Sequence, residues 1–217
     1  MEVRRIEPFL THEWLKYKHY AKRIPPIIWA FGLYDDNILK GVCTFGMPAR
    51  AMNNGDCVFT EYRVKTLELN RLVVEDELPK NTLSFFVARC LKMLSTPCCV
   101  VSYADDSNGH NGYIYQATNW VYTGKNQVHD RQIYLGDNEV HPRTAVQKSG
   151  SVNAFCQQYG AILGEYTHKH RYFQFLGSKS EKRKMRKQLI YDVQPYPKGE
   201  NKRYDSSYKA HTQLTMF

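Results

Sequence analysis

A strand–helix–strand pattern over residues 66–103 constrains the fold of this chain more than any other feature. Residues 66–74 are mostly apolar with alternating faces, and residues 98–103 form a short apolar run, so both are predicted to be strands. Between them, apolar side chains recur at helical spacing, at Leu83, Phe86, Val87, Cys90, Leu91 and Leu94. Two strands joined by one helix lie parallel through a right-handed crossover. The pattern therefore predicts an α/β (α+β) fold in which these two strands are neighbours.

The other predicted elements are shorter. We expect a helix over Thr11–Lys22, with Thr11 as its N-cap and His19 and Tyr20 in its last turn. We also expect strands over 27–32, 38–45, 119–124, 131–135 and 171–176, and short helices over 141–150 and 151–159. Together they predict a central mixed sheet flanked by helices, formed by residues 1–176.

The stretch Tyr103–Gly124 carries the clearest candidate chemistry. Asp105 and Asp106 directly follow an apolar strand, and Tyr115 lies ten residues further on, in a short helical segment. Open α/β folds place reactive side chains at the carboxyl ends of their strands. The residues also fit a capped turn with a solvated aspartate and a core tyrosine, so they leave both interpretations open.

Three further sets of residues are candidate site residues. Arg71 shares a predicted strand face with Leu67, Leu69 and Val73, where a guanidinium calls for a carboxylate or phosphate partner unless it reaches solvent at a sheet edge. Lys80 and its neighbours precede the main helix, whose N-terminus favours anions, as every helix N-terminus does. His19 and Tyr20 fit an acid–base pair, metal ligands or a structural pair.

Positive charge is concentrated at the end of the chain. The net charge is +9, and residues 177–217 hold ten of the lysines and arginines but four acids. Such an excess favours a polyanion through the release of condensed counterions. We expect a basic helix and tail over 177–217 that contacts DNA phosphates, unless it is only a solvated basic helix. The predicted contacts are Lys182, Arg183, Lys184, Arg186 and Lys187.

Membrane and secretion signals are lacking in the sequence. No apolar run reaches the length of a membrane span, and the charged start Met1–Arg5 is not followed by the apolar segment of a secretory signal. The six cysteines show no paired zinc spacing. We expect reduced thiols, a cytoplasmic location and no membrane partner.

The order of elements resembles the GCN5-related N-acetyltransferase (GNAT) fold. The segment Gly112–Gly124 is similar to the late helix and strand of that superfamily, in which a tyrosine matching Tyr115 often protonates the leaving thiolate of coenzyme A. Where that superfamily has a glycine-rich pyrophosphate loop, this chain has residues 75–81 without glycine.

A narrower resemblance is to the Mom family. It is carried by Leu69–Val74, by Pro79–Asn81 with Ser84, and by Ala104–Asp105 through Gly109–His110 to Tyr115–Asn119. The resemblance implies addition of a carbamoylmethyl group to the exocyclic amine of adenine in DNA, which protects phage DNA from restriction. It also implies catalytic roles for His19, Tyr20, Asp105 and Tyr115, and places Arg71, Lys80, Asn81 and Ser84 on the cofactor side.

This resemblance implies double-stranded DNA as partner, in the cytoplasm of a bacterial host if the gene belongs to a phage. The donor is left open between an acyl-CoA and an activated glycine such as glycyl-tRNA. A metal ion at His19 and Tyr20 and a homodimer are also left open. Two other functions compete: a conventional GNAT that acetylates a small-molecule or protein amine, and a non-enzymatic DNA-binding accessory protein.

Overall fold

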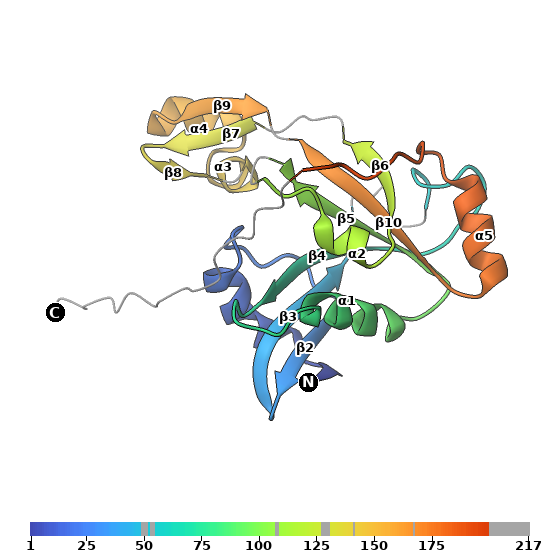
Figure 1. The fold of residues 1–217 in the computed structure, drawn as a ribbon. Helices are drawn as coiled ribbons and strands as arrows, with labels where there is room; N and C mark the ends of the chain where they lie inside the picture. The colour runs from blue at the N-terminus through green and yellow to red at the C-terminus, as the bar shows by residue number, and fades with distance from the viewer. Residues whose placement is uncertain are drawn as a thin grey trace.

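A computed structural model describes residues 1–48, 52, 55–106, 109–126, 131–140, 142–166 and 168–199. Its centre is a seven-stranded mixed sheet in the order β1-β2-β3-β4-β5-β10-β6 (Figure 1). The strands are β1 (Glu2–Arg5), β2 (Trp29–Asp35), β3 (Ile38–Gly46), β4 (Thr66–Val74), β5 (Cys98–Asp105), β6 (Val121–Lys125) and β10 (Lys169–Leu176). The predicted mixed sheet is therefore confirmed.

The two strands of the strand–helix–strand unit are adjacent and parallel, as predicted. β4 pairs with β5 from Thr66 opposite Cys99 to Glu68 opposite Val101. The helix between them, α1 (Thr82–Lys92), buries its apolar face against the sheet. Among the described residues, the ladder between the strands ends at Glu68, although β4 continues to Val74. The carboxyl-terminal halves of β4 and β5 therefore diverge, as Figure 1 shows.

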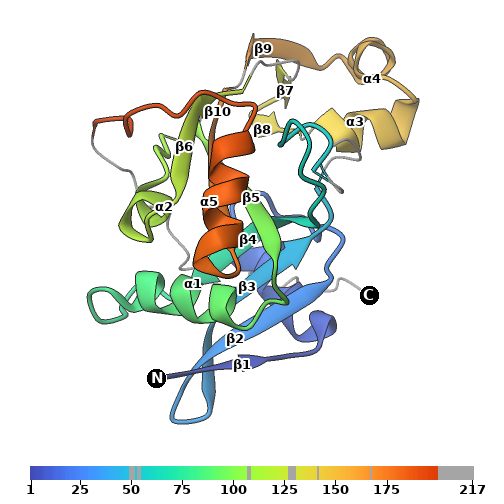
Figure 2. The same ribbon diagram turned by 90° about the vertical axis from the view of Figure 1, so that its right-hand side faces the viewer.

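Helical segments cover both faces of the sheet. One face carries α1 and α2 (Tyr113–Ala117), which enclose the largest buried cluster. The other carries a 3-10 helix (Pro8–Thr11) and a π-helix (Trp14–Lys18) over β3 and β4. On that same face, α5 (Lys179–Gln188) packs on β5 and β10 through Met185 (Figure 2).

A bulge in β4 corrects the predicted faces of that strand. Leu69 and Arg71 pair with consecutive residues of β3, so Asn70 is an extra residue in the ladder. Leu67 and Leu69 therefore pack under α1, whereas Val73 packs on the opposite face with the N-terminal helical segment. The prediction that these residues share one face is wrong, because alternation cannot reveal an inserted residue.

The first helix also differs from the prediction. It starts at Pro8, ends at Lys18, and the hydroxyl of Thr11 donates to the carbonyl of Pro8 at 2.7 Å rather than capping a helix. Proline suits the first turn of a helix because its φ is already fixed there. His19 is extended (φ −82°, ψ 135°), so it follows the helix instead of lying in its last turn.

A small unit with its own core is inserted between β6 and β10. Its three-stranded sheet contains β7 (Arg131–Leu135), β8 (Asn138–Glu139) and β9 (Ile162–Tyr166), packed against α3 (Pro142–Ser149) and α4 (Val152–Tyr159). Ile133, Ala145 and Phe155 form its buried centre. The sequence predicted its helices and β7, but not β8 or β9.

The six cysteines are all free thiols. None of the helices that the structure describes combines the length and the apolar character required to cross a membrane.

Candidate active site

A cavity of about 190 Å³ lies where β4 and β5 diverge. Its wall comes from the segment after the first helix, the second half of β4, the end of β5 with the loop that follows, and the start of α2. Five predicted site residues line it together: His19, Tyr20, Arg71, Asp105 and Tyr115. Their roles remain predictions, but segments distant in sequence bring them to one place.

The two neighbouring aspartates face different surroundings. Asp105 ends β5 and lines the cavity. The carboxylate of Asp106 lies 2.6 Å from Nζ of Lys125 and 3.3 Å from Nε2 of the buried His170. Asp106 thus ties the end of β5 to β6 and β10, and Asp105 is the member of the pair that lines the cavity.

His19 is a neutral hydrogen-bond donor. The residue is 4% exposed, and its Nδ1 accepts the backbone N–H of Ala21 at 3.0 Å. Burial, reinforced by the charges of Arg71 and His110, lowers the pKa of His19 to about 3. A neutral imidazole whose Nδ1 accepts must carry its proton on Nε2. His19 can therefore act as a donor through Nε2 and is not suited to act as a base in this arrangement.

Aromatic rings cluster at Tyr20. Its ring stacks on His19 with 4.5 Å between centroids and meets the ring of His110 edge-on at 5.5 Å. Crowding by neighbouring atoms and then the charge of Asp105 raise the pKa of Tyr20, although 40% of the residue stays exposed. Tyr20 is therefore a neutral phenol that combines a flat apolar face with a polar tip.

Tyr115 is buried at the other side of the cavity. Its hydroxyl lies 2.7 Å from that of Ser102 on β5, and its ring packs against Trp120 and Tyr172. Burial raises the pKa of Tyr115 well above its ordinary value. The residue is thus protonated at neutral pH and suited to donate a hydrogen bond or a proton.

Arg71 brings positive charge to the cavity wall. Nε donates to the carbonyl of Arg23 at 3.3 Å, and Nη1 donates to that of Asn70 at 2.6 Å. Burial lowers the pKa of Arg71, but guanidinium stays protonated in proteins. No carboxylate of the described residues lies within ion-pair distance of it, so its charge can serve an anionic group in the cavity.

The predicted cofactor residues do not gather with Arg71. Asn81 and Ser84 line a separate hollow between α1 and the end of α2, and among the described residues Lys80 lines neither cavity. Asn81 adopts a left-handed conformation (φ 69°), and its carbonyl accepts the hydroxyl of Ser84 at 2.9 Å. The structure therefore places Arg71 in the cavity between β4 and β5, Asn81 and Ser84 in the separate hollow, and Lys80 in neither.

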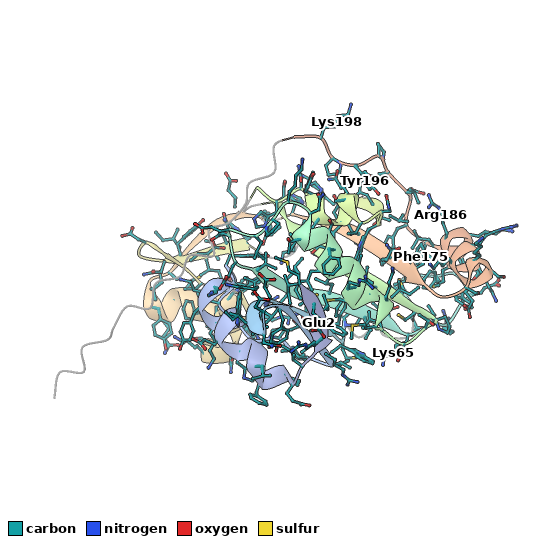
Figure 3. All side chains as sticks on the ribbon, turned by 60° about the horizontal axis from the view of Figure 1, so that its bottom comes forward. Glu2, Lys65, Phe175, Arg186, Tyr196 and Lys198 are labelled. Carbon is teal, nitrogen blue, oxygen red and sulfur yellow. The ribbon has the colours of Figure 1, made fainter. Side chains whose placement is uncertain are left out.

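The predicted DNA-contacting helix forms with the expected cap. Ser178 and Glu181 make a capping box, and Met185 anchors α5 to the sheet. The five predicted contacts are exposed, namely Lys182, Arg183, Lys184, Arg186 and Lys187. Figure 3 shows Arg186 at the outer edge of the molecule. Residues 200–217 of the predicted basic tail lie outside the described residues.

The surroundings of His19 do not favour metal ligation. Within the described ranges, no group of three or more His, Cys, Asp or Glu side chains could hold a metal ion. Nδ1 of His19 is also occupied by the backbone of Ala21.

Three residues at the site were not predicted from the sequence. Asn70 and His110 line the cavity, and Ser102 contacts the hydroxyl of Tyr115. Ser102 could have been noticed in the sequence, because Ser102 and Tyr103 carry the only hydroxyl groups in the apolar run 98–103. Asn70 was hidden because its place depends on the bulge.

The chain is similar to a phage protein in sequence and to acetyltransferases among the solved structures. Over 205 residues the chain is 27% identical to "Methylcarbamoylase mom" of Escherichia phage Mu, covering 91% of this chain and 84% of that protein. Similar solved structures include yncA, a putative acetyltransferase from Salmonella typhimurium with acetyl-CoA (TM-score 0.45, 10% identity, 82% of this chain and 95% of that one). Another is NAA60 of Arabidopsis thaliana with a bisubstrate analogue (TM-score 0.47, 14% identity, 80% and 97%). The model of the Mom protein family matches residues 1–198, and the chain belongs to that family.

Proposed function

We propose that this protein is a transferase that adds a carbamoylmethyl group to the exocyclic amine of adenine in DNA. Membership of the Mom family and the phage Mu methylcarbamoylase relative support the proposal. The observation that carries it is the cavity between β4 and β5, where Asp105 faces neutral donors and the cation of Arg71.

The side chains suit the needs of this reaction. The adenine amine is a weak nucleophile because its lone pair is delocalised into the ring, so it needs a proton acceptor and an activated donor. His19 and Tyr20 are neutral donors, which leaves Asp105 as the group that accepts the amine proton. Tyr115 donates to the leaving group or developing oxyanion, and Arg71 holds negative charge.

The same cavity also suits an adenine that has left the duplex. A base inside a duplex must leave the stack before its amine can react, and aromatic side chains then replace the lost stacking. The half-exposed ring of Tyr20, with His110 edge-on beside it, offers such a surface at the cavity. The cations of α5 supply phosphate contacts elsewhere on the duplex.

The residues before α1 do not fit a donor held by a diphosphate. Residues 75–77 are three consecutive acids, and the loop 75–81 has no glycine through which backbone N–H groups could approach phosphates closely. We therefore propose an activated acyl or glycyl donor without assigning its carrier, and no step here involves coenzyme A.

The test is nucleoside mass spectrometry of DNA from cells that express the protein. Asp105→Asn removes the proton acceptor and Tyr115→Phe removes the donor, so each is expected to lower adenine modification about 10²- to 10⁴-fold. DNA binding and the folded state should be retained, because neither change alters side-chain size appreciably.

Asp106→Asn is the matched control. It makes the same chemical change one residue away, at a carboxylate that binds Lys125 and His170. Modification near wild-type levels in both site variants would place the active site elsewhere. An unmodified adenine pool with tight acetyl-CoA binding would favour a conventional acetyltransferase, and DNA binding alone would favour an accessory protein.

A further inference from the structure

The hydroxyl of Ser102 lies at the point where the two parallel strands separate. The ladder between β4 and β5 ends with Glu68 opposite Val101, and the next residues along are Leu69 and Ser102. Oγ of Ser102 is 2.8 Å from the carbonyl oxygen of Leu69. Ser102 is 1% exposed, so its hydroxyl is shielded from bulk water and the fold sets which groups it can reach.

The hydroxyl hydrogens in this contact allow two arrangements. A hydroxyl has one hydrogen, and a carbonyl oxygen can only accept. Ser102 can therefore donate to one partner at a time. When it donates to Leu69, the hydroxyl of Tyr115, 2.7 Å away, donates to Oγ of Ser102, and when it donates to Tyr115, the hydrogen of the phenol is left for a group in the cavity. In both arrangements a chain of hydrogen bonds or close contacts joins Tyr115 through Ser102 to the main chain of β4, and only the second arrangement leaves Tyr115 ready to donate to the substrate.

This chain changes when Tyr115 gives its proton to the substrate. The O–H bond of Tyr115 breaks, the proton goes to the leaving group or oxyanion, and a phenolate remains in a buried site. Such an anion needs a donor, and unsatisfied buried charge is costly. The hydroxyl of Ser102 can rotate from the Leu69 carbonyl to the phenolate oxygen while its own O–H bond stays intact.

We propose that Ser102 is a positioning residue for Tyr115: it aims the tyrosine hydroxyl at rest and stabilises the phenolate during transfer. The proposal rests on the proposed function, in which Tyr115 is the donor. The direction of the electrostatic effect agrees, since the hydrogen bond to Ser102 opposes the rise that burial causes in the pKa of Tyr115. Hydrogen bonds to charged groups are also stronger than those to neutral ones.

Thr66 provides a control for a purely structural role. It is a fully buried hydroxyl on β4 that lies 3.4 Å from the carbonyl of Val64. Ser102→Ala and Thr66→Val each remove a buried hydroxyl that contacts a main-chain carbonyl. Ser102→Thr keeps the hydroxyl and tests for rescue.

The first measurement does not depend on activity. Difluorotyrosine, a stronger acid than tyrosine, is placed at position 115 and titrated by ¹⁹F NMR. Ser102→Ala should raise the titration midpoint by about one pH unit or more, from the strength of hydrogen bonds to charged groups. Ser102→Thr should return it toward wild type, and Thr66→Val should leave it unchanged. A midpoint unmoved by Ser102→Ala overturns the proposal.

The second measurement is a double-mutant cycle on turnover. Ser102→Ala should lower kcat about tenfold or more with little change in KM, and should cause no further loss when position 115 is already phenylalanine. An equal loss in both backgrounds would show that Ser102 acts independently of Tyr115 and would overturn the proposal. If the wild-type protein modified no DNA, the proposed function would be wrong. The NMR titration would still show whether Ser102 stabilises the phenolate of Tyr115.

Discussion

The neutral state of His19 predicts a specific loss of stability in mild acid. In the unfolded chain a histidine has a pKa of 6.5, whereas burial lowers that of folded His19 to about 3. Between these values the unfolded chain binds a proton that the folded protein excludes. Because the unfolded state then binds more protons, stability falls as the pH drops through this window.

The magnitude follows from the two values. At pH 7 neither state is much protonated, so His19 contributes almost no difference. At pH 5 the unfolded histidine is largely protonated and the folded one is not, which destabilises the fold by about 2 kcal/mol relative to pH 7. This free-energy difference depends mainly on the pKa of the histidine in the unfolded chain, because pH 5 is well above the folded pKa of about 3. His19 is 4% exposed, so solvent does little to screen the effect.

The assay is urea unfolding of wild type and His19→Gln at pH 7 and pH 5. Glutamine cannot take up the proton. Between pH 7 and pH 5 the free energy of unfolding of the variant should therefore fall by about 2 kcal/mol less than that of wild type. His110 and His170 titrate in both proteins and their contributions cancel in the comparison. An identical loss in the two proteins would mean that His19 is protonated in the fold, and its assignment as a neutral donor would be wrong.

Two further predictions concern the framework and the basic helix. Gly112→Ala should lower stability by about 1–3 kcal/mol in thermal unfolding, because φ is +77° and the new Cβ would collide with the ring of Tyr172. Gly136→Ala is the control, since φ is +58° there but nothing lies within 4 Å of the new Cβ. Comparing the two variants separates the cost of backbone strain from the cost of the collision. Changing Lys182, Arg183, Lys184 and Arg186 to glutamate should weaken DNA binding and flatten its salt dependence, by about 0.9 in log–log slope for each phosphate that the protein no longer neutralises. An unchanged slope would exclude α5 from the DNA interface.

The sequence predicted those parts of the fold in which local pattern and tertiary packing agree. The apolar stripe of α1 and the runs on either side of it specify one crossover, so the pairing of β4 with β5 could be predicted. The edge strand Glu2–Arg5 and the strand Ile162–Tyr166 escaped because few of their side chains are buried, and an exposed strand has no distinctive pattern.

The site was predicted only in part for a similar reason. Asp105 and Tyr115 lie in one continuous motif, and their positions follow from the strand and helix that carry them. Asn81 and Ser84 were grouped with Arg71 because the family resemblance implies a cofactor side for all of them, but they line a separate hollow. Which cavity a helix start borders depends on how that helix packs, and the start of α1 borders the hollow that α1 shares with the end of α2.

The position of α5 relative to the cavity has a consequence for the footprint on DNA. α5 follows Leu176, which pairs with Cys98 at the start of β5, whereas the cavity lies at Asp105, where β5 ends. Seven residue steps of extended chain separate these points by about 23 Å. With a rise of about 3.4 Å per base pair, a duplex that lies along β5, contacts the start of α5 and delivers an adenine to the cavity spans about seven base pairs. It spans fewer if it contacts the end of α5, because the chain beyond that helix has returned to Tyr122, which pairs with the middle of β10. Shortening an oligonucleotide below this length should therefore remove the contacts at the start of α5 first.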